Sequence, residues 1–195
     1  FRAAGGGWRG SAGVPRGAAA DFPDVSFADP RVRIADMNGD GLPDLVQLQS
    51  GSIAWWPNLG HGRFGPRVEM ARSPRWSPTI SPERIQFADL DGDGAADLVL
   101  LEDDRVCVWI NGSGEGWSEV PIEVRGLPRV TDADPLRVVD LLGTGTAGLL
   151  WCPSSERGAR PMHFLDLAGG VKPYLISAID NNLGAVTRIA YRSST

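Results

Sequence analysis

Two nine-residue loops rich in aspartate and glycine carry the chemistry that this sequence can offer. They run over residues 36–44 and 89–97, and each places oxygen-bearing side chains at its positions 1, 3, 5 and 9. The candidate ligands are Asp36, Asn38, Asp40 and Asp44 in the first loop, and Asp89, Asp91, Asp93 and Asp97 in the second. Calcium binds about six to eight oxygens, and the backbone carbonyl at position 7, of Leu42 or Ala95, would add one oxygen to each set. The pattern therefore predicts two calcium ions, one in each loop.

The charges of these loops explain why they would need a cation. Seven ionised aspartates crowded into two short turns would repel one another unless a cation neutralised them. Both loops also carry glycine at positions 4 and 6, where a chain folding tightly around an ion needs backbone conformations that a Cβ atom would oppose. Magnesium fits such a loop less well than calcium, because it keeps several of its bound waters.

Two other interpretations of the loops remain open. An EF-hand or dockerin loop would have helices on both sides and, in an EF-hand, a glutamate at position 12. Here position 12 is Gln47 or Leu100, and the short apolar run after each loop is typical of a buried strand. Alternatively, the loops are solvated Asp/Gly turns without an ion, although unrelated turns would not be expected to share this spacing.

The segments that surround the loops repeat with them, 53 residues apart. Each copy has an apolar run before the loop, two after it and one at its end, and it also has an Asn/Gly turn closed by an aromatic residue. The matching pairs of expected strands are 32–36 and 85–89, 45–48 and 98–101, 53–56 and 106–109, and 67–70 and 122–124. About four short antiparallel strands in each unit is the content of a propeller blade. We therefore expect an all-β chain of β-propeller-like blades.

A third copy begins near residue 135, and its loop runs over 140–148. It keeps the first aspartate, Asp140, and both glycines, but Leu142, Thr144 and Gly148 stand where the other ligands would be. We expect this loop to keep its turn and to bind no ion.

These copies divide the chain into five parts. We expect an irregular lead-in over 1–28, a repeat with a calcium loop over 29–79, a second over 80–132, a degenerate third repeat over 133–179, and a strand leading to a following domain over 180–195. Three units are fewer than the four to eight blades that close a typical propeller. Since the chain also begins at Phe1 without a methionine, we expect it to be a segment of a longer protein.

Composition excludes several classes of function. The net charge of −5 and the absence of a basic stripe with interleaved aromatic residues argue against nucleic-acid binding. No apolar stretch approaches the length of a membrane span, about 20 residues. Cys107 and Cys152 lie in apolar strand-like runs and are expected to be small core residues, not a disulfide. No base–nucleophile pattern surrounds either cysteine, so we do not expect an enzyme.

The tryptophans offer a possible partner site. Trp55 and Trp56 are neighbours in an expected strand, so their side chains should point to opposite faces. An exposed Trp55 could stack on a sugar or contact a protein partner. Trp56 and Trp109 occupy the same repeat position, and we expect both to pack between blades.

The repeated units resemble FG-GAP/VCBS repeats. The pattern D-x-[DN]-G-D-G-x-x-D, followed by strands and by N-x-G-x-G-x-[FW], runs over 36–64 and again over 89–117. Outside the loops, residues 7–11, 22–27 and 180–194 are similar to the SpvB/TcdB-like family, the B components of bacterial insecticidal toxin complexes and related virulence proteins.

This resemblance implies a role as well as a fold. It implies a secreted, non-catalytic β-propeller segment within a shell that the B component builds with a C component. The propeller would dock to the pore-forming A component and gate the exit of the toxic polypeptide. The alternative is an extracellular adhesion or carbohydrate-binding propeller, which would use the same repeats.

Overall fold

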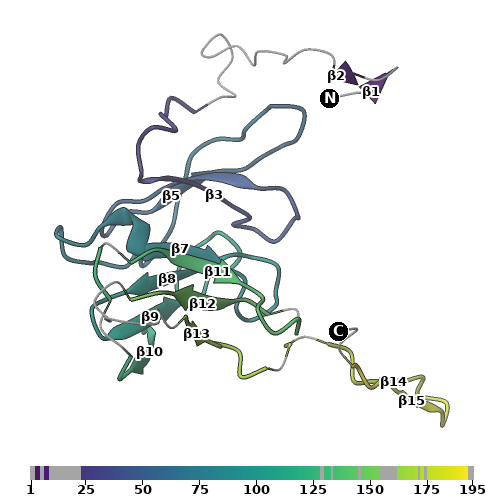
Figure 1. Ribbon diagram of the computed structural model, residues 1–195. Coiled ribbons are helices and arrows are strands. Elements are labelled where there is room, and N and C mark those ends of the chain that lie inside the picture. The colour runs from purple at the N-terminus through teal and green to yellow at the C-terminus, as the bar shows by residue number, and fades with distance from the viewer. Residues whose placement is uncertain are drawn as a thin grey trace.

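The computed structural model describes residues 3–4, 7–8, 23–127, 130–132, 134–144, 146–153, 162–170, 172–173 and 175–192. Within these residues the fold is built from short antiparallel strands, together with one 3-10 turn, η1 (Pro82–Arg84). Three sheets follow one another along the chain, and Figure 1 shows the second and third lying side by side. This arrangement confirms the predicted all-β fold of propeller-like blades.

Blade 1 and blade 2 are four-stranded sheets with the same topology. Blade 1 contains β3 (Val32–Ala35), β4 (Asp44–Gln47), β5 (Ala54–Trp56) and β6 (Val68–Glu69), paired in that order. Blade 2 contains β7 (Ile85–Ala88), β8 (Asp97–Leu101), β9 (Arg105–Trp109) and β10 (Ile122–Arg125), also paired in order. The register repeats as well, because Leu45 faces Trp56 in blade 1 and Leu98 faces Trp109 in blade 2.

Blade 3 is shorter in the part of the chain that the structure describes. It pairs β11 (Leu136–Val139), β12 (Gly148–Trp151) and β13 (His163–Leu165). Near the C-terminus, β14 (Ala178–Asp180) and β15 (Val186–Arg188) form a hairpin of exposed residues, which projects away from the three sheets (Figure 1). A hairpin therefore stands where one terminal strand was expected.

Most of the expected lead-in over 1–28 lies outside the described residues. What is described there includes a short hairpin of β1 (Ala3–Ala4) and β2 (Gly7–Trp8). None of the helices in the described ranges is long and apolar enough to cross a membrane.

The core forms between blades. Alternate residues of a strand point to opposite faces of its sheet, and β8 uses both of its faces in this way. Leu98 and Leu100 face blade 1, in one apolar cluster with Val46, Leu48 and Trp55. The residues between them and beyond, Val99 and Leu101, face blade 3 in a second cluster that includes Leu149 and Trp151. All five residues of β8 are consequently buried, and blade 2 is the middle layer of the stack.

The other face of blade 1 has less cover. Trp56 and Phe64 pack beside Leu45 there, on the side turned away from blade 2. Ile34 is 60% exposed, whereas Phe87, its repeat equivalent, packs against the cluster between blades 1 and 2. The prediction that both repeat-equivalent tryptophans pack between blades is confirmed for Trp109. For Trp56, the described chain supplies no blade on that side.

Candidate metal centre

Loop 1 (36–44) and loop 2 (89–97) connect the first and second strands of blades 1 and 2, at the same end of each blade. In both loops the position-1 aspartate holds the turn by accepting backbone N–H groups. In loop 1, Gly39 donates to Oδ1 of Asp36 at 2.8 Å and Gly41 donates to Oδ2 at 2.7 Å. The two equivalent bonds to Asp89 in loop 2 measure 2.6 and 3.2 Å. Gly39 and Gly41 have φ angles of 77° and 82°, in the left-handed region that favours glycine.

The position-9 aspartates tie each loop to the Asn/Gly turn that follows it. Asp97 is fully buried, and its two carboxylate oxygens accept N–H groups from Leu90 at 3.0 Å and Asn111 at 2.8 Å. Asp44 is also fully buried and accepts the two equivalent N–H groups of loop 1, at 2.9 and 2.7 Å. An ionised carboxylate has about four lone-pair sites. Each oxygen therefore keeps capacity for a further ligand.

Burial disfavours the ionised form of these carboxyl groups. The pKa of Asp97 is raised to about 7: burial is the largest cause, the two backbone hydrogen bonds oppose it, and the nearby charges of Asp91 and Asp93 add to it. Burial is also the main cause of the raised pKa of Asp44 and of Asp91. A bound cation would act in the opposite sense, because an adjacent positive charge favours the carboxylate.

Loop 2 brings three carboxylates together. Asp89, Asp91 and Asp97 each offer an oxygen, and these oxygens lie within 4.8 Å of one another. Among the described residues this is the one group of three acidic, histidine or cysteine side chains that meets this criterion. The equivalent positions of loop 1 hold Asp36, Asn38 and Asp44, so an amide takes the place of one carboxylate.

The position-5 aspartates each accept a backbone N–H group of their own loop. Oδ1 of Asp40 accepts the N–H of Leu42 at 2.8 Å, and Oδ1 of Asp93 accepts the N–H of Ala95 at 2.8 Å. Both aspartates are exposed and turned toward the backbone of their own loop. Asp40 also accepts a hydrogen bond from Nδ2 of Asn38 at 3.0 Å. Of the residues expected to offer position-7 carbonyls, Leu42 is partly exposed and Ala95 is buried.

Loop 3 (140–148) keeps the turn by the same means. Oδ1 of Asp140 accepts the N–H of Thr144 at 3.1 Å, and Gly143 has a φ of 66°. Gly145 lies outside the described residues. At position 9, a Cβ atom on Gly148 would lie 2.5 Å from the ring of Phe164 and 2.5 Å from the carbonyl oxygen of Leu165. Phe164 thus fills the space that an aspartate would need.

Trp55, the candidate contact for a partner, has a buried side chain. Its side chain is only 5% exposed, because its face of β5 packs against blade 2. The indole N–H donates to the carbonyl oxygen of Gly114 at 2.9 Å, so the polar edge of the ring is engaged across the blade interface. Trp55 is therefore an anchor between blades and offers no surface to a sugar or a protein partner.

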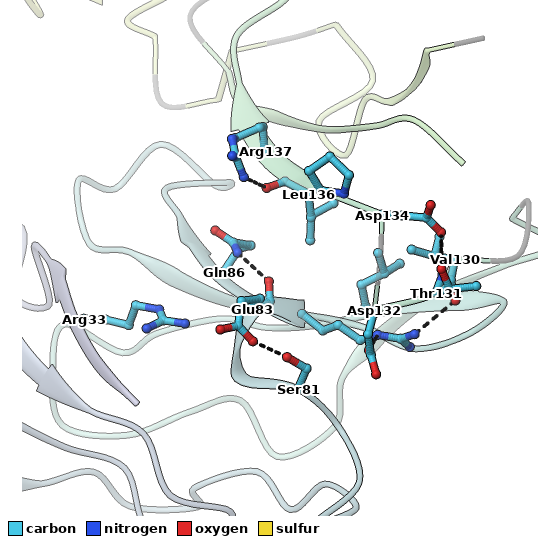
Figure 2. Close-up of a pocket in the computed structure, with 13 residues that line it drawn as sticks. Arg33, Ser81, Glu83, Gln86, Val130, Thr131, Asp132, Asp134, Leu136 and Arg137 are labelled. Carbon is cyan, nitrogen blue, oxygen red and sulfur yellow. Dashed lines mark hydrogen bonds and ion pairs between the residues drawn. The ribbon is translucent and has the colours of Figure 1, made fainter. Parts of the chain in front are cut away.

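A cavity of about 430 Å³ lies beside the first strands of the three blades. Arg33, Gln86 and Arg137 line it from repeat-equivalent positions, and Figure 2 shows them on three different parts of the chain. Its arginines are matched by Glu83, Asp132 and Asp134, and the guanidinium groups already donate to backbone carbonyls or pair with carboxylates. This balance gives the cavity no preference for an anion or a cation.

The two cysteines are free thiols, as expected. Cys107 is buried among the apolar residues between blades 1 and 2, and burial raises the pKa of its thiol. A raised pKa makes the reactive thiolate scarcer at neutral pH.

Sequence reasoning missed Asn111, which is only 1% exposed. The sequence identifies it only as part of an Asn/Gly turn. In the structure its side chain reaches both loop 1 and loop 2, through bonds to Met37 and Ala96. The repeat-equivalent Asn58 was a signal that this position matters, but the contact between blades could not be deduced from it.

Comparison with known proteins agrees with this architecture. Residues 36–100 match the family of FG-GAP-like repeats, and residues 111–195 match the middle/N-terminal region of the insecticide toxin TcdB. No curated protein sequence matches the chain.

Solved toxin complexes contain a similar segment. The crystal structure of TcdB2-TccC3 without its hypervariable C-terminal region is similar at 33% identity with a TM-score of 0.72, over 86% of this chain and 8% of that chain. The Tc holotoxin pore of Photorhabdus luminescens is similar at 33% identity with a TM-score of 0.69, over 83% of this chain and 8% of that chain.

A lectin shares the fold alone. The Agrocybe aegerita protein, which recognises non-reducing terminal N-acetylglucosamine, is 20% identical with a TM-score of 0.51, over 71% of this chain and 35% of the lectin.

The blade geometry, the FG-GAP-like loops and the two TcdB matches lead to one conclusion: the chain is a propeller segment of the family of the insecticide toxin TcdB.

Proposed function

We propose that this segment is a non-catalytic, calcium-stabilised propeller module of a toxin complex B component, which docks to the pore-forming component and gates the passage of the toxic polypeptide. The observation that carries the proposal is the 33% identity with TcdB2-TccC3 over 86% of this chain. The same similarity supports a C component as a partner, and the similarity to the Tc holotoxin pore supports the pore-forming A component and secretion. Because the chain spans about 8% of those toxin chains, these roles belong to the whole protein in which the segment acts.

The proposed role of calcium is structural. In each loop, the position-1 residue directly follows one strand and the position-9 residue begins the strand paired with it, and in loop 2 three carboxylates converge. A cation held there would link the start of one strand to the end of its neighbour. A ligand that binds only the folded state stabilises it by about 2.7 kcal/mol at a concentration a hundred times its dissociation constant. Calcium would thus hold the blades together and leave partner recognition to their surfaces.

Catalysis has no support in the geometry. In the described ranges, the converging carboxylates lie in the proposed ion site, and the acidic side chains of the cavity are balanced by arginines. An exposed Trp55 would have favoured the carbohydrate-binding alternative. Since that side chain is buried and hydrogen-bonded to Gly114, we do not propose it.

The docking role can be tested by hydrogen–deuterium exchange on the full-length protein assembled with its C component. Exchange is measured with and without the pore-forming component. We expect slower exchange within residues 29–179 when the pore-forming component is present. Protection confined to other parts of the assembly would refute docking through this segment, and it would leave the calcium proposal intact.

A further inference from the structure

Loop 1 and loop 2 lie against each other across the boundary between blades. The N–H of Ala96 in loop 2 donates to the carbonyl oxygen of Asp36 in loop 1 at 2.7 Å. The two backbones are also in close contact, since a Cβ atom on Gly39 would lie 3.4 Å from the carbonyl oxygen of Asp93 and one on Gly94 would lie 3.5 Å from Cα of Gly39. The candidate ligands of the two loops are therefore carried by two backbone segments that contact each other directly.

Asn111 strengthens this connection from within the core. Its Nδ2 group donates to the carbonyl oxygen of Met37 in loop 1 at 2.8 Å and to that of Ala96 in loop 2 at 3.1 Å. Its backbone N–H donates to Oδ1 of Asp97 at 2.8 Å, and its Oδ1 accepts the N–H of Gly114 at 2.8 Å. Both amide hydrogens are thus used, one toward each loop, at a site shielded from water.

The repeat supplies a matched comparison for this residue. Asn58 occupies the same position in blade 1, and its backbone N–H donates to Asp44 at 2.7 Å. Its Nδ2 group donates to the carbonyl oxygen of Pro43 at 2.9 Å, which is the equivalent of the bond from Asn111 to Ala96. The bond that crosses to another blade is made by Asn111, and no equivalent of it is described for Asn58.

We propose that Asn111 and the backbone contact make the two loops one coupled unit, so that a cation bound in either loop raises the affinity of the other. The inference rests on the proposed calcium binding and adds its regulation. The first ion orders the backbone that both loops share, and the second ion then meets less of the entropic cost of ordering it. Coulomb repulsion between two bound dications opposes this effect, so positive coupling must come from the shared network.

Coupling is measured by calorimetric titration of the calcium-free full chain with calcium. Asp40→Ala and Asp93→Ala each remove the exposed position-5 carboxylate, from loop 1 and loop 2 respectively, without touching Asn111. The calcium affinity measured for each variant then estimates the affinity of the unchanged loop alone. In the wild type, the product of the two stepwise association constants should exceed the product of the two single-site constants by a factor between about 5 and 150, the usual range for coupled sites.

Asn111→Ala should lower this factor clearly, with the remainder carried by the bond from Ala96 to Asp36, whereas Asn58→Ala should leave it unchanged. If Asn111→Ala does not fold, the comparison of the wild type with the two aspartate variants still decides whether the sites are coupled. Two sites that bind independently in the wild type would overturn the coupling and leave the calcium proposal standing. No detectable calcium binding in the wild type would overturn both.

Discussion

Replacing Trp55 separates a structural role from a recognition role with one substitution. The side chain is 5% exposed, lies in the cluster between blades 1 and 2, and donates its indole N–H across the interface to Gly114. Truncating a buried tryptophan to alanine costs about 3–5 kcal/mol through lost transfer free energy and the cavity left behind. The carbonyl of Gly114 also loses its donor, a net loss of about 1 kcal/mol. We therefore expect Trp55→Ala to lie near the upper end, at about 4–5 kcal/mol.

The melting temperature gives the readout. A domain of 150–250 residues loses about 2–4 °C for each kcal/mol, so Trp55→Ala should melt about 8–20 °C lower than the wild type in a calorimetric scan. Trp55→Phe keeps a ring in the interface but removes the donor, and should cost about 1–2 kcal/mol. Trp56→Ala is the matched control, because Trp56 lies on the partly covered outer face of blade 1. It should cost clearly less than Trp55→Ala.

Two results would refute this reasoning. If Trp55→Ala melted no lower than Trp56→Ala, then the cluster between the blades would not be held by Trp55. If Trp55→Ala kept its melting temperature but lost binding to a glycan array, the side chain would have to be accessible. The carbohydrate-binding function would then return as the better proposal.

The remaining predictions concern the three loops. If calcium is present at a hundred times the dissociation constant of a site, chelating it should lower the melting temperature of the purified protein by about 5–11 °C for each site. An unchanged melting temperature would refute the proposal that calcium stabilises the fold. Asp97→Asn should abolish most of the part of this chelation effect that comes from loop 2, because it neutralises one of three converging carboxylates. An equal fall in melting temperature on chelation of the variant and the wild type would contradict this. In loop 3, Gly148→Ala should destabilise by more than about 2 kcal/mol in urea denaturation, since the new methyl group would overlap Phe164. Gly126→Ala is its control, with a φ of 80° and no atom within 4 Å of the added Cβ, and it should cost less, about 1–2 kcal/mol for the left-handed backbone alone.

Much of the fold could be predicted because its signals are local. The apolar runs on both sides of each loop form paired strands. Trp56 and Trp109, which are equivalent in the repeat, also occupy equivalent positions in the strand register of the two sheets. The turn-forming part of the loops was predictable for the same reason, since Asp36 and its glycines lie within five residues of one another.

What could not be predicted depends on how one blade meets the next. The sequence places Trp55 and Trp56 on opposite faces but does not say which face another blade covers. The hydrogen bond from Asn111 to Met37 joins residues 74 positions apart, so no local sequence pattern predicts it. In loop 3, the loss of the position-9 aspartate was visible, but the ring of Phe164 that replaces it comes from a strand outside the loop.

The burial of β8 on both faces has a consequence for the order in which the molecule opens. Proteins unfold locally in cooperative units, and amides in the best-buried strands exchange only through the largest openings. Blade 1 or blade 3 can separate while β8 still keeps one apolar face covered. The slowest-exchanging amides should therefore lie in β8, within Asp97–Leu101. Asp97 begins that strand, so the candidate ion site of loop 2 is anchored in the segment of the chain that stays native longest.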